Sequence, residues 1–177
     1  MSSILSLDVS ASSTGWCYTD NGIDFLCGLI KTNPKDSRSV RLLKFSTELE
    51  ELLLKLKPNF IVQEDTFSGK NVKTLKILSE FAGVSKLTCM KILSLEPYII
   101  TNKTVKSYFM VPTKEELFCF MCDIFELFHL SFSKDNDIID AKAQLLCFAD
   151  EIVGLYKFRI TKDYGYLYLE GIGGKEN

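Results

Sequence analysis

The sequence predicts a single α/β domain in which a mixed five-stranded sheet is flanked by helices. Its 177 residues match one domain with a substantial core. Three short apolar runs joined by turns open the chain, which favours antiparallel strands. A later apolar run is reached through a long amphipathic helix, and such crossovers usually make a strand parallel to its neighbour.

Composition and charge are those of an ordinary globular protein. Hydrophobic residues make up 46% of the chain, charged residues 25%, and the formal net charge is −2. No apolar run reaches transmembrane length and no secretory signal pattern opens the chain, so we expect a cytoplasmic protein without membrane contact. Because the molecule is not basic overall, any DNA contact must use a local basic patch or acids neutralised by metal.

Six cysteines are scattered through mostly apolar segments. Without a secretory signal, reduced and buried thiols are favoured over disulfides. Cys119 and Cys122 form a lone CxxC inside an apolar helical run, and His129 is the only histidine. A zinc site is therefore the weaker interpretation of this pair.

The first three strands are predicted at residues 4–9, 15–20 and 23–30, in antiparallel succession. Asn21 and Gly22 separate the second from the third, because Asn-Gly accepts the positive φ of a hairpin turn. Asp8 lies near the end of the first strand, in what should be a buried sheet. A carboxylate there must find a hydrogen-bond donor, a cation or a metal.

The first helix is expected to begin after Asp36 or Ser37 and to end at Lys57, before a proline. The fourth strand, residues 60–62, follows it and is closed by Gln63, Glu64 and Asp65. Since the carboxyl ends of parallel strands meet at the same sheet edge, Asp8 and Glu64 are expected to lie together.

The second half of the chain predicts three helices, one strand and a C-terminal hairpin. The domain is placed at residues 1–157 and a C-terminal extension at 158–177, whose last seven residues look frayed. Lysines 103, 106 and 114 fall in a polar connection after the fifth strand. The predicted elements are a helix over 71–91, a strand over 97–101, a helix from Glu116 to Phe128 capped by Thr113, a helix from Asp135 or Asn136 to about Leu155, and a hairpin over 158–170 around Tyr164 and Gly165.

Small residues at positions 82–85, with Gly83 among them, suggest that another helix approaches the 71–91 helix closely. Packing on the sheet and a dimer contact both fit this pattern. The very apolar helix from Glu116 to Phe128 could complete such an interface.

Four carboxylates could converge at one sheet edge. Asp137 and Asp140 are three residues apart on a helix and hence share a face, which Asp8 and Glu64 could meet. Such a cluster repels itself unless cations neutralise it, and Mg²⁺ prefers oxygen ligands. Two such ions, about 3.5–4 Å apart, clamp the attacking and leaving oxygens in phosphodiester hydrolysis, and Mn²⁺ accepts the same ligands. Taken singly, each acid could instead be a turn former, a helix-terminal acid or part of a solvated loop.

Three stretches resemble the RuvC family of Holliday-junction resolvases, within the RNase H-like (retroviral integrase) superfamily, over about residues 3–153. Residues 8–16 look like its opening strand and turn, with Asp followed by Thr-Gly-aromatic. Residues 58–71 are similar to its second motif, in which Glu comes six residues after Pro and is followed by Phe and Lys-Asn. Residues 137–141 resemble its closing DxxDA helix start. The family's Gly after the first Asp is Ser10 here, and the hairpin has no counterpart in the family pattern.

The resemblance implies an RNase H-like fold and assigns the catalytic and metal-ligating roles to Asp8, Glu64, Asp137 and Asp140. Phe67 would stack on bases near the exchange point, and lysines would contact phosphates. The expected DNA-binding residues are Phe67, Lys70, Lys103, Lys106 and Lys114.

These observations together predict a Mg²⁺-dependent endonuclease that resolves four-way DNA junctions by paired symmetric cuts, using two ions. Two symmetric cuts imply a homodimer, most simply with C₂ symmetry. Other branched DNA, or RNA, is the alternative substrate. An actin-like phosphotransferase would need a second domain and a second phosphate loop, and a non-catalytic binding module would have no use for four converging acids.

Overall fold

The computed structural model describes residues 2–66, 72–154, 157–163 and 166–172. Its centre is the predicted mixed five-stranded sheet, and its strands follow the order β3-β2-β1-β4-β5. β1, β2 and β3 are antiparallel, whereas β4 and β5 run parallel to β1. The strands are β1 (Ile4–Asp8), β2 (Ser13–Thr19), β3 (Leu26–Lys31), β4 (Phe60–Glu64) and β5 (Tyr98–Ile100).

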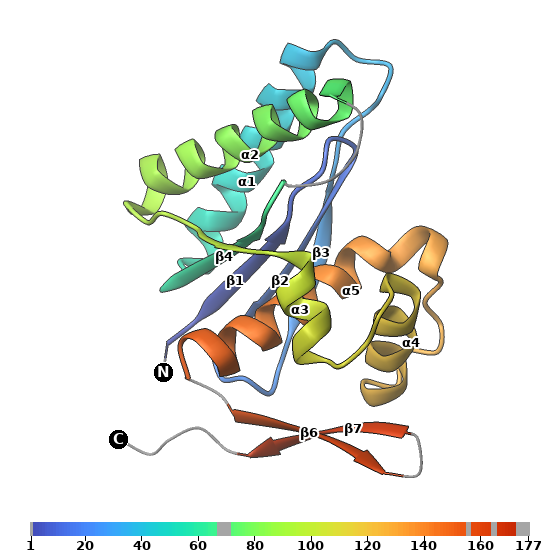
Figure 1. Cartoon of the computed structure of the whole chain (residues 1–177). Coiled ribbons are helices and arrows are strands. Elements are labelled where there is room, and N and C mark those ends of the chain that lie inside the picture. Colours follow the sequence, from blue (N-terminus) through green and yellow to red (C-terminus); the bar gives the residue numbers. More distant parts are fainter. Residues whose placement is uncertain (1, 67–71, 155–156, 164–165, 173–177) are drawn as a thin grey trace.

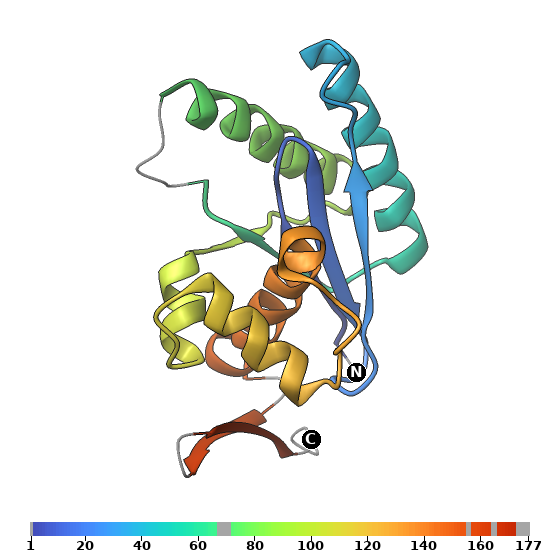
Figure 2. The same ribbon diagram turned by 90° about the vertical axis from the view of Figure 1, so that its right-hand side faces the viewer.

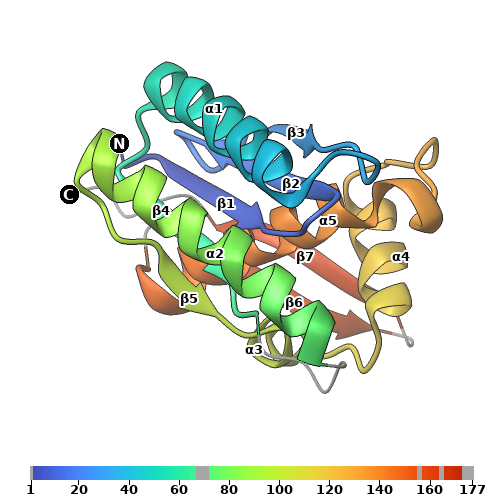
Figure 3. The same cartoon turned by 90° about the horizontal axis from the view of Figure 1, so that it is seen from above.

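Helices cover both faces of this sheet (Figures 1 and 2). Seen from above, α1 and α2 lie side by side across one face (Figure 3). The other face is covered mainly by α5, with α3 and α4 beside it. The helices are α1 (Arg38–Leu56), α2 (Val72–Leu93), α3 (Asn102–Tyr108), α4 (Lys114–Ile124) and α5 (Phe132–Cys147), which continues as a π-helical turn, η1 (Phe148–Ile152).

Alternation along the strands builds a separate core on each face. In β1, Leu5 and Leu7 pack under α1 and α2, whereas Ile4 points to the α5 side. Period-2 alternation requires this division, because successive side chains of a strand point to opposite faces. Ser6 also faces α5, and it is a fully buried polar residue within an otherwise apolar strand.

The structure corrects two predicted element starts. Residues 23–25 are not part of β3, because the Asn21 side chain accepts the backbone N–H groups of Ile23 and Asp24, both at 2.8 Å, and holds them in a turn. The last helix begins at Phe132 after Ser131, before the predicted Asp135 or Asn136. It ends as the π-helical turn η1 and does not continue as an α-helix to Leu155.

Two further corrections concern α3 and α4. The connection that carries Lys103 and Lys106 is a short helix, α3, because the Thr101 side chain accepts the N–H of Thr104 at 3.1 Å and caps it. α4 starts at Lys114 and stops at Ile124, so it does not reach Phe128. Its apolar residues fill the core against α5, so the apolar surface of α4 is already used within this chain.

The small residues of α2 divide between two faces. Ala82 and Ser85 are buried, and Thr88 on the same side forms a 3.0 Å hydrogen bond with Ser46 of α1. Gly83 is exposed, and a Cβ built on it would meet no atom within 4 Å. Packing within the chain therefore accounts for Ala82 and Ser85, but not for Gly83.

The C-terminal hairpin is confirmed as a two-stranded sheet, β6 (Lys157–Asp163) and β7 (Tyr166–Ile172), beside α4 and η1 (Figure 1). The division into a domain at 1–157 and an extension at 158–177 stays a prediction. No helix among the described residues is long and apolar enough to cross a membrane.

Candidate active site

Asp8 and Glu64 lie side by side at one edge of the sheet. β1 and β4 are parallel with Leu7 opposite Gln63, and each acid is the next residue along its strand. Asp8 and Glu64 line the same cleft, and Glu64 acts directly on the Asp8 carboxyl group. Burial, together with the charge of Glu64, raises the pKa of Asp8 well above its ordinary value. The predicted meeting of these two carboxylates is thus confirmed.

Helix α5 brings two more acids to the same edge. Asp137 lines a cleft of about 230 Å³ together with Asp8 and Glu64. Asp140, one turn later, is 4% exposed and interacts electrostatically with Asp8 and Glu64. The four predicted acids therefore surround one site.

A glycine on β2 allows this approach of α5. A Cβ built on Gly15 would lie 1.9 Å from the backbone oxygen of Asp137, far inside any real contact distance. Only glycine lets the start of α5 come so close to the sheet. Gly15 is paired with Asp8 in the β1–β2 ladder and lies against the Asp137 backbone. This one residue therefore brings Asp8 and Asp137 together.

Among the described residues, Lys114, the first residue of α4, is the cation that lines this cleft. Its Nζ donates to Asp140 Oδ2 at 2.7 Å. Burial alone would lower the pKa of Lys114, but the negative charges of Asp140, Glu64 and Asp8 raise it above its ordinary value. Burial raises the pKa of Asp140, and the ammonium of Lys114 acts in the opposite direction. One lysine thus only partly neutralises this acidic cluster.

Hydrogen bonds within the turn after Asp8, and others from side chains outside it, hold this turn in place. Ser10 Oγ donates to the Ser13 oxygen at 2.7 Å, and Thr14 Oγ1 donates to the Ser10 oxygen at 3.1 Å. The Ala11 oxygen accepts hydrogen bonds from Arg41 of α1 and from the Thr32 hydroxyl. Ser10, where the family pattern has Gly, lines the cleft and directs its hydroxyl into the turn. Sequence reasoning missed Arg41, because a single basic residue on a helix surface carries no signal of its partner.

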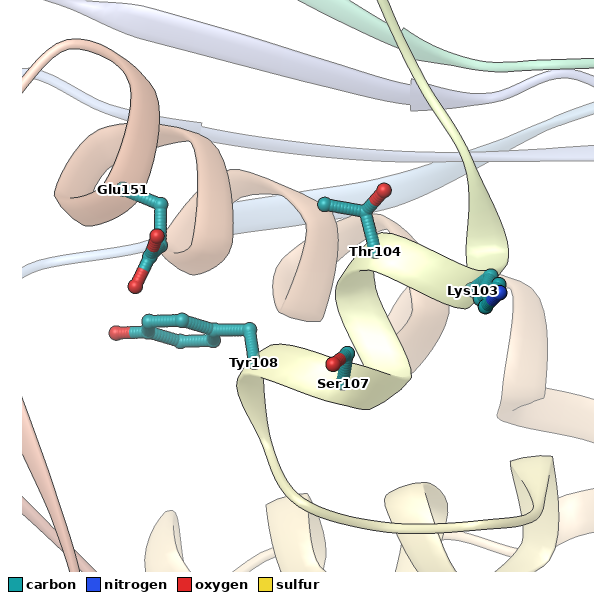
Figure 4. A pocket seen from close by; sticks show the side chains of 5 residues that line it. All are labelled: Lys103, Thr104, Ser107, Tyr108 and Glu151. Carbon is teal, nitrogen blue, oxygen red and sulfur yellow. The ribbon is translucent and has the colours of Figure 1, made fainter.

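The described lysines among the predicted DNA-binding residues, Lys103, Lys106 and Lys114, have different surroundings. Lys103 lies in a separate cavity of about 440 Å³ with Thr104, Ser107, Tyr108 and Glu151, between α3 and η1 (Figure 4). Of the three described lysines in that prediction, only Lys114 lines the acidic cleft.

Lys106 donates to the Pro112 oxygen at 3.2 Å, in the connection that leads to α4. Phe67 and Lys70 lie outside the described residues, so their predicted roles stay predictions.

The donor set of the cleft suits hard divalent cations, because the acids supply only carboxylate oxygens. In the described part of the chain, however, no three His, Cys, Asp or Glu side chains stand at the spacing of metal ligands. The two cysteines of the CxxC pair lie in different environments, since Cys119 is exposed and Cys122 is buried. Some of these acids would have to rotate towards a bound ion.

Curated relatives of this chain are crossover junction endodeoxyribonucleases RuvC. The protein of Rickettsia akari is 30% identical over 113 residues, which cover 59% of this chain and 71% of that relative. The protein of Chlorobium phaeovibrioides is 33% identical over 85 residues, 45% of each chain, and that of Caldicellulosiruptor saccharolyticus 32% over 93 residues, 50% of this chain and 56% of the relative. The chain thus spans about half the length of these last two relatives. No protein-family model matches it.

Solved structures show the same fold. A structure of Thermus thermophilus RuvC in complex with a Holliday junction substrate superposes with a TM-score of 0.71 at 15% identity, over 87% of this chain and 98% of that one. The yeast mitochondrial Holliday junction resolvase Ydc2 superposes with a TM-score of 0.55 at 12% identity, over 81% of this chain and 76% of that one. The fold is therefore RNase H-like, and the identity with the Rickettsia protein across most of its length shows that this chain belongs to the RuvC family.

Proposed function

We propose that this protein is a structure-selective endonuclease that resolves four-way DNA junctions by metal-dependent phosphodiester hydrolysis. The observation that carries the proposal is the meeting of Asp8, Glu64, Asp137 and Asp140 around one cleft at the carboxyl ends of β1 and β4. A non-catalytic module would gain nothing from mutually repelling acids in a half-buried cleft.

The four acids would hold two divalent cations, Mg²⁺ or Mn²⁺. When bound, such ions supply the positive charge that activates a water molecule and stabilises the leaving oxygen of the phosphodiester. Asp8 and Glu64 are fixed on adjacent strands, which supports a role for both as ligands. Lys114, once released from Asp140, can contact a DNA phosphate beside the scissile bond.

Four-way junctions are the favoured substrate because of the family and the related structures. The Thermus thermophilus protein was solved with a Holliday junction, and the curated relatives are named for crossover junctions. The same acidic cleft would also suit other branched DNA or RNA. We infer that Phe67 stacks on bases near the exchange point, since it directly follows the cleft residues Asp65 and Thr66 in the sequence.

A homodimer would provide the two symmetric cuts. The outer face of α2 supports this assembly, because Gly83, Leu87 and Met90 lie at helical spacing and Leu87 is 69% exposed. Gly83 leaves room for a second helix to approach closely. A C₂ dimer would place two acidic clefts on opposite strands of one junction.

A cleavage assay on matched substrates tests the proposal. A four-way junction, a Y-fork, a nicked duplex and an RNA/DNA hybrid are compared with Mg²⁺, with Mn²⁺ and with a chelator. We expect paired cuts in the four-way junction with either ion and none with the chelator. Stronger cleavage of the hybrid than of the junction would instead support the RNA-directed alternative.

A further inference from the structure

A buried amide lies directly behind Glu64. Gln144 of α5 is 1% exposed, and its Nε2 donates to Glu64 Oε2 at 3.2 Å. Gln144 follows Asp140 by four residues, so both project from the same face of α5. One face of α5 thus presents Asp140, a candidate metal ligand, and Gln144, the hydrogen-bond partner of the candidate ligand Glu64.

A second hydrogen bond fixes the orientation of this amide. Ser6 of β1, which is fully buried, donates its hydroxyl to Gln144 Oε1 at 3.3 Å. With its oxygen engaged by Ser6, the amide turns its NH₂ group towards Glu64. The chain Ser6–Gln144–Glu64 links β1, α5 and β4 beneath the cleft floor.

Burying an amide between the sheet and α5 is costly unless it is hydrogen-bonded. The neighbouring positions of this face, such as Ala141 and Leu145, are apolar and fully buried. A leucine or methionine would fill the space of Gln144 without needing hydrogen-bond partners. The amide therefore has a use other than packing, and the only carboxylate to which it donates, among the described residues, is Glu64.

We propose that Gln144 is a positioning residue that fixes the Glu64 carboxylate in the orientation needed to bind a divalent cation. The inference rests on the proposed function, in which Glu64 is a metal ligand. Gln144 occupies one oxygen of Glu64, and the same carboxylate also interacts with Asp8. Groups that hold a metal ligand in place typically change metal affinity or activity about 10–100-fold when they are removed.

The test replaces Gln144 by methionine, which keeps the length of the side chain and removes both hydrogen bonds. We expect Gln144→Met to raise the Mg²⁺ concentration for half-maximal cleavage about 10–100-fold. It should also reduce the rise in melting temperature that Mg²⁺ produces without DNA. Junction binding in Ca²⁺ should stay close to that of the unaltered protein.

Ser6→Ala is the second variant, because it leaves Gln144 in place and removes only the bond that orients it. Its effect on the Mg²⁺ midpoint should have the same sign and be smaller. Leu145→Val is the matched control: it makes a buried change on the same helix and should lower the melting temperature without moving the midpoint. If Gln144→Met does not fold, Ser6→Ala still tests the inference.

Glu64→Gln, measured in parallel, separates the two possible failures. If Glu64→Gln cleaves normally, the proposed function of the site is wrong, and the positioning role is lost with it. If Glu64→Gln is inactive but Gln144→Met and Ser6→Ala keep the Mg²⁺ midpoint and the Mg²⁺-induced rise in melting temperature, Gln144 is a packing residue and the inference is overturned.

Discussion

At the scale of single residues, the site combines acids that resist ionisation with one lysine that resists losing its proton. Burial and neighbouring negative charge raise the pKa of Asp8, and burial raises that of Asp140. The same acids raise the pKa of Lys114 above its ordinary value. Perturbed pKa values of several groups within one cleft are common at functional sites.

Asp8→Asn should abolish cleavage and yet stabilise the metal-free protein at neutral pH. The folded state holds the proton of Asp8 more tightly than the unfolded state, whose pKa is near the ordinary 3.8. Asp8 therefore costs stability as the pH rises from that value through its raised folded pKa, and the cost stays at neutral pH. Asparagine removes this cost.

Melting curves of Asp8→Asn and of the unaltered protein, recorded with a chelator from pH 4 to pH 8, check the direction of this effect. The advantage of Asp8→Asn over the unaltered protein should grow as the pH rises through the lower part of this range. Junction binding should be retained, because lost negative charge cannot weaken attraction to phosphates. Full cleavage by Asp8→Asn would remove Asp8 from the site.

Lys114→Met should lower both stability and cleavage. It leaves the buried Asp140 carboxylate without its 2.7 Å partner. Because the Lys114 side chain is 39% exposed, the loss of stability should fall between the ~1 kcal/mol of exposed pairs and the ~3 kcal/mol of buried ones. Lys114→Arg should restore most of the stability. Chemical denaturation measures the loss, and an unchanged free energy of unfolding for Lys114→Met would show that the ion pair is not held in solution.

At the scale of elements, the approach of α5 to β2 decides whether the acids meet. This contact depends on Gly15, against which the Asp137 backbone packs. The turn after β1 is held by Arg41 of α1 and by Thr32, the residue after β3, so these segments also help to shape the cleft. Elements distant in sequence thus set the geometry of a site whose acids lie on three short segments.

Gly15→Val should move α5 away from the sheet and reduce cleavage more than stability alone explains. Overpacking usually costs about 1–3 kcal/mol, and here it also separates Asp137 from Asp8. Gly83→Ala is the control, since no atom lies within 4 Å of its added Cβ and alanine favours a helix by about 1 kcal/mol. Cleavage rates of both variants, each measured well below its melting temperature, distinguish a displaced α5 from a general loss of stability. Normal cleavage by a folded Gly15→Val would show that α5 need not stay close.

At the scale of the whole molecule, the outer face of α2 keeps large apolar side chains exposed, among them Leu87 at 69% and Met90 at 47%. The apolar residues of α4 pack within the chain, and the outer face of α2 is the proposed contact between subunits. The hairpin forms its own sheet beside α4 and η1 and does not extend the central sheet.

Gly83→Leu should dissociate the dimer, because a bulky side chain keeps the two α2 helices apart. Leu87→Glu should act similarly by placing a charge in the contact. We expect light scattering to give a monomer for both variants, which should nick junctions without resolving them. Gly83→Ala serves again as the control and should remain dimeric. A monomer of the unaltered protein that still makes paired cuts would exclude this interface and the symmetric mechanism.

The sequence by itself determined the sheet, most of its helices and the four acids. Strand periodicity and the helical crossover place Asp8 and Glu64 at adjacent strand ends, since these patterns depend on local geometry and on the parallel arrangement of β1 and β4. Local hydrogen bonds explain two of the misplaced boundaries. Asn21 and Thr101 hold their neighbours by short hydrogen bonds that a hydrophobic pattern does not reveal.

Only the tertiary structure decided which side chains support the acids. Lys114, Gln144 and Arg41 come from three different helices, and each acts on a group 26 to 80 residues away in the chain. The DNA contact of Lys114 stays a prediction, whereas its ion pair with Asp140 was found only in the structure. Gln144 looked like an ordinary residue of a helix, because its partners lie on β1 and β4. Hydrogen bonds and ion pairs across such separations depend on how the layers pack, and no pattern in the sequence records that packing.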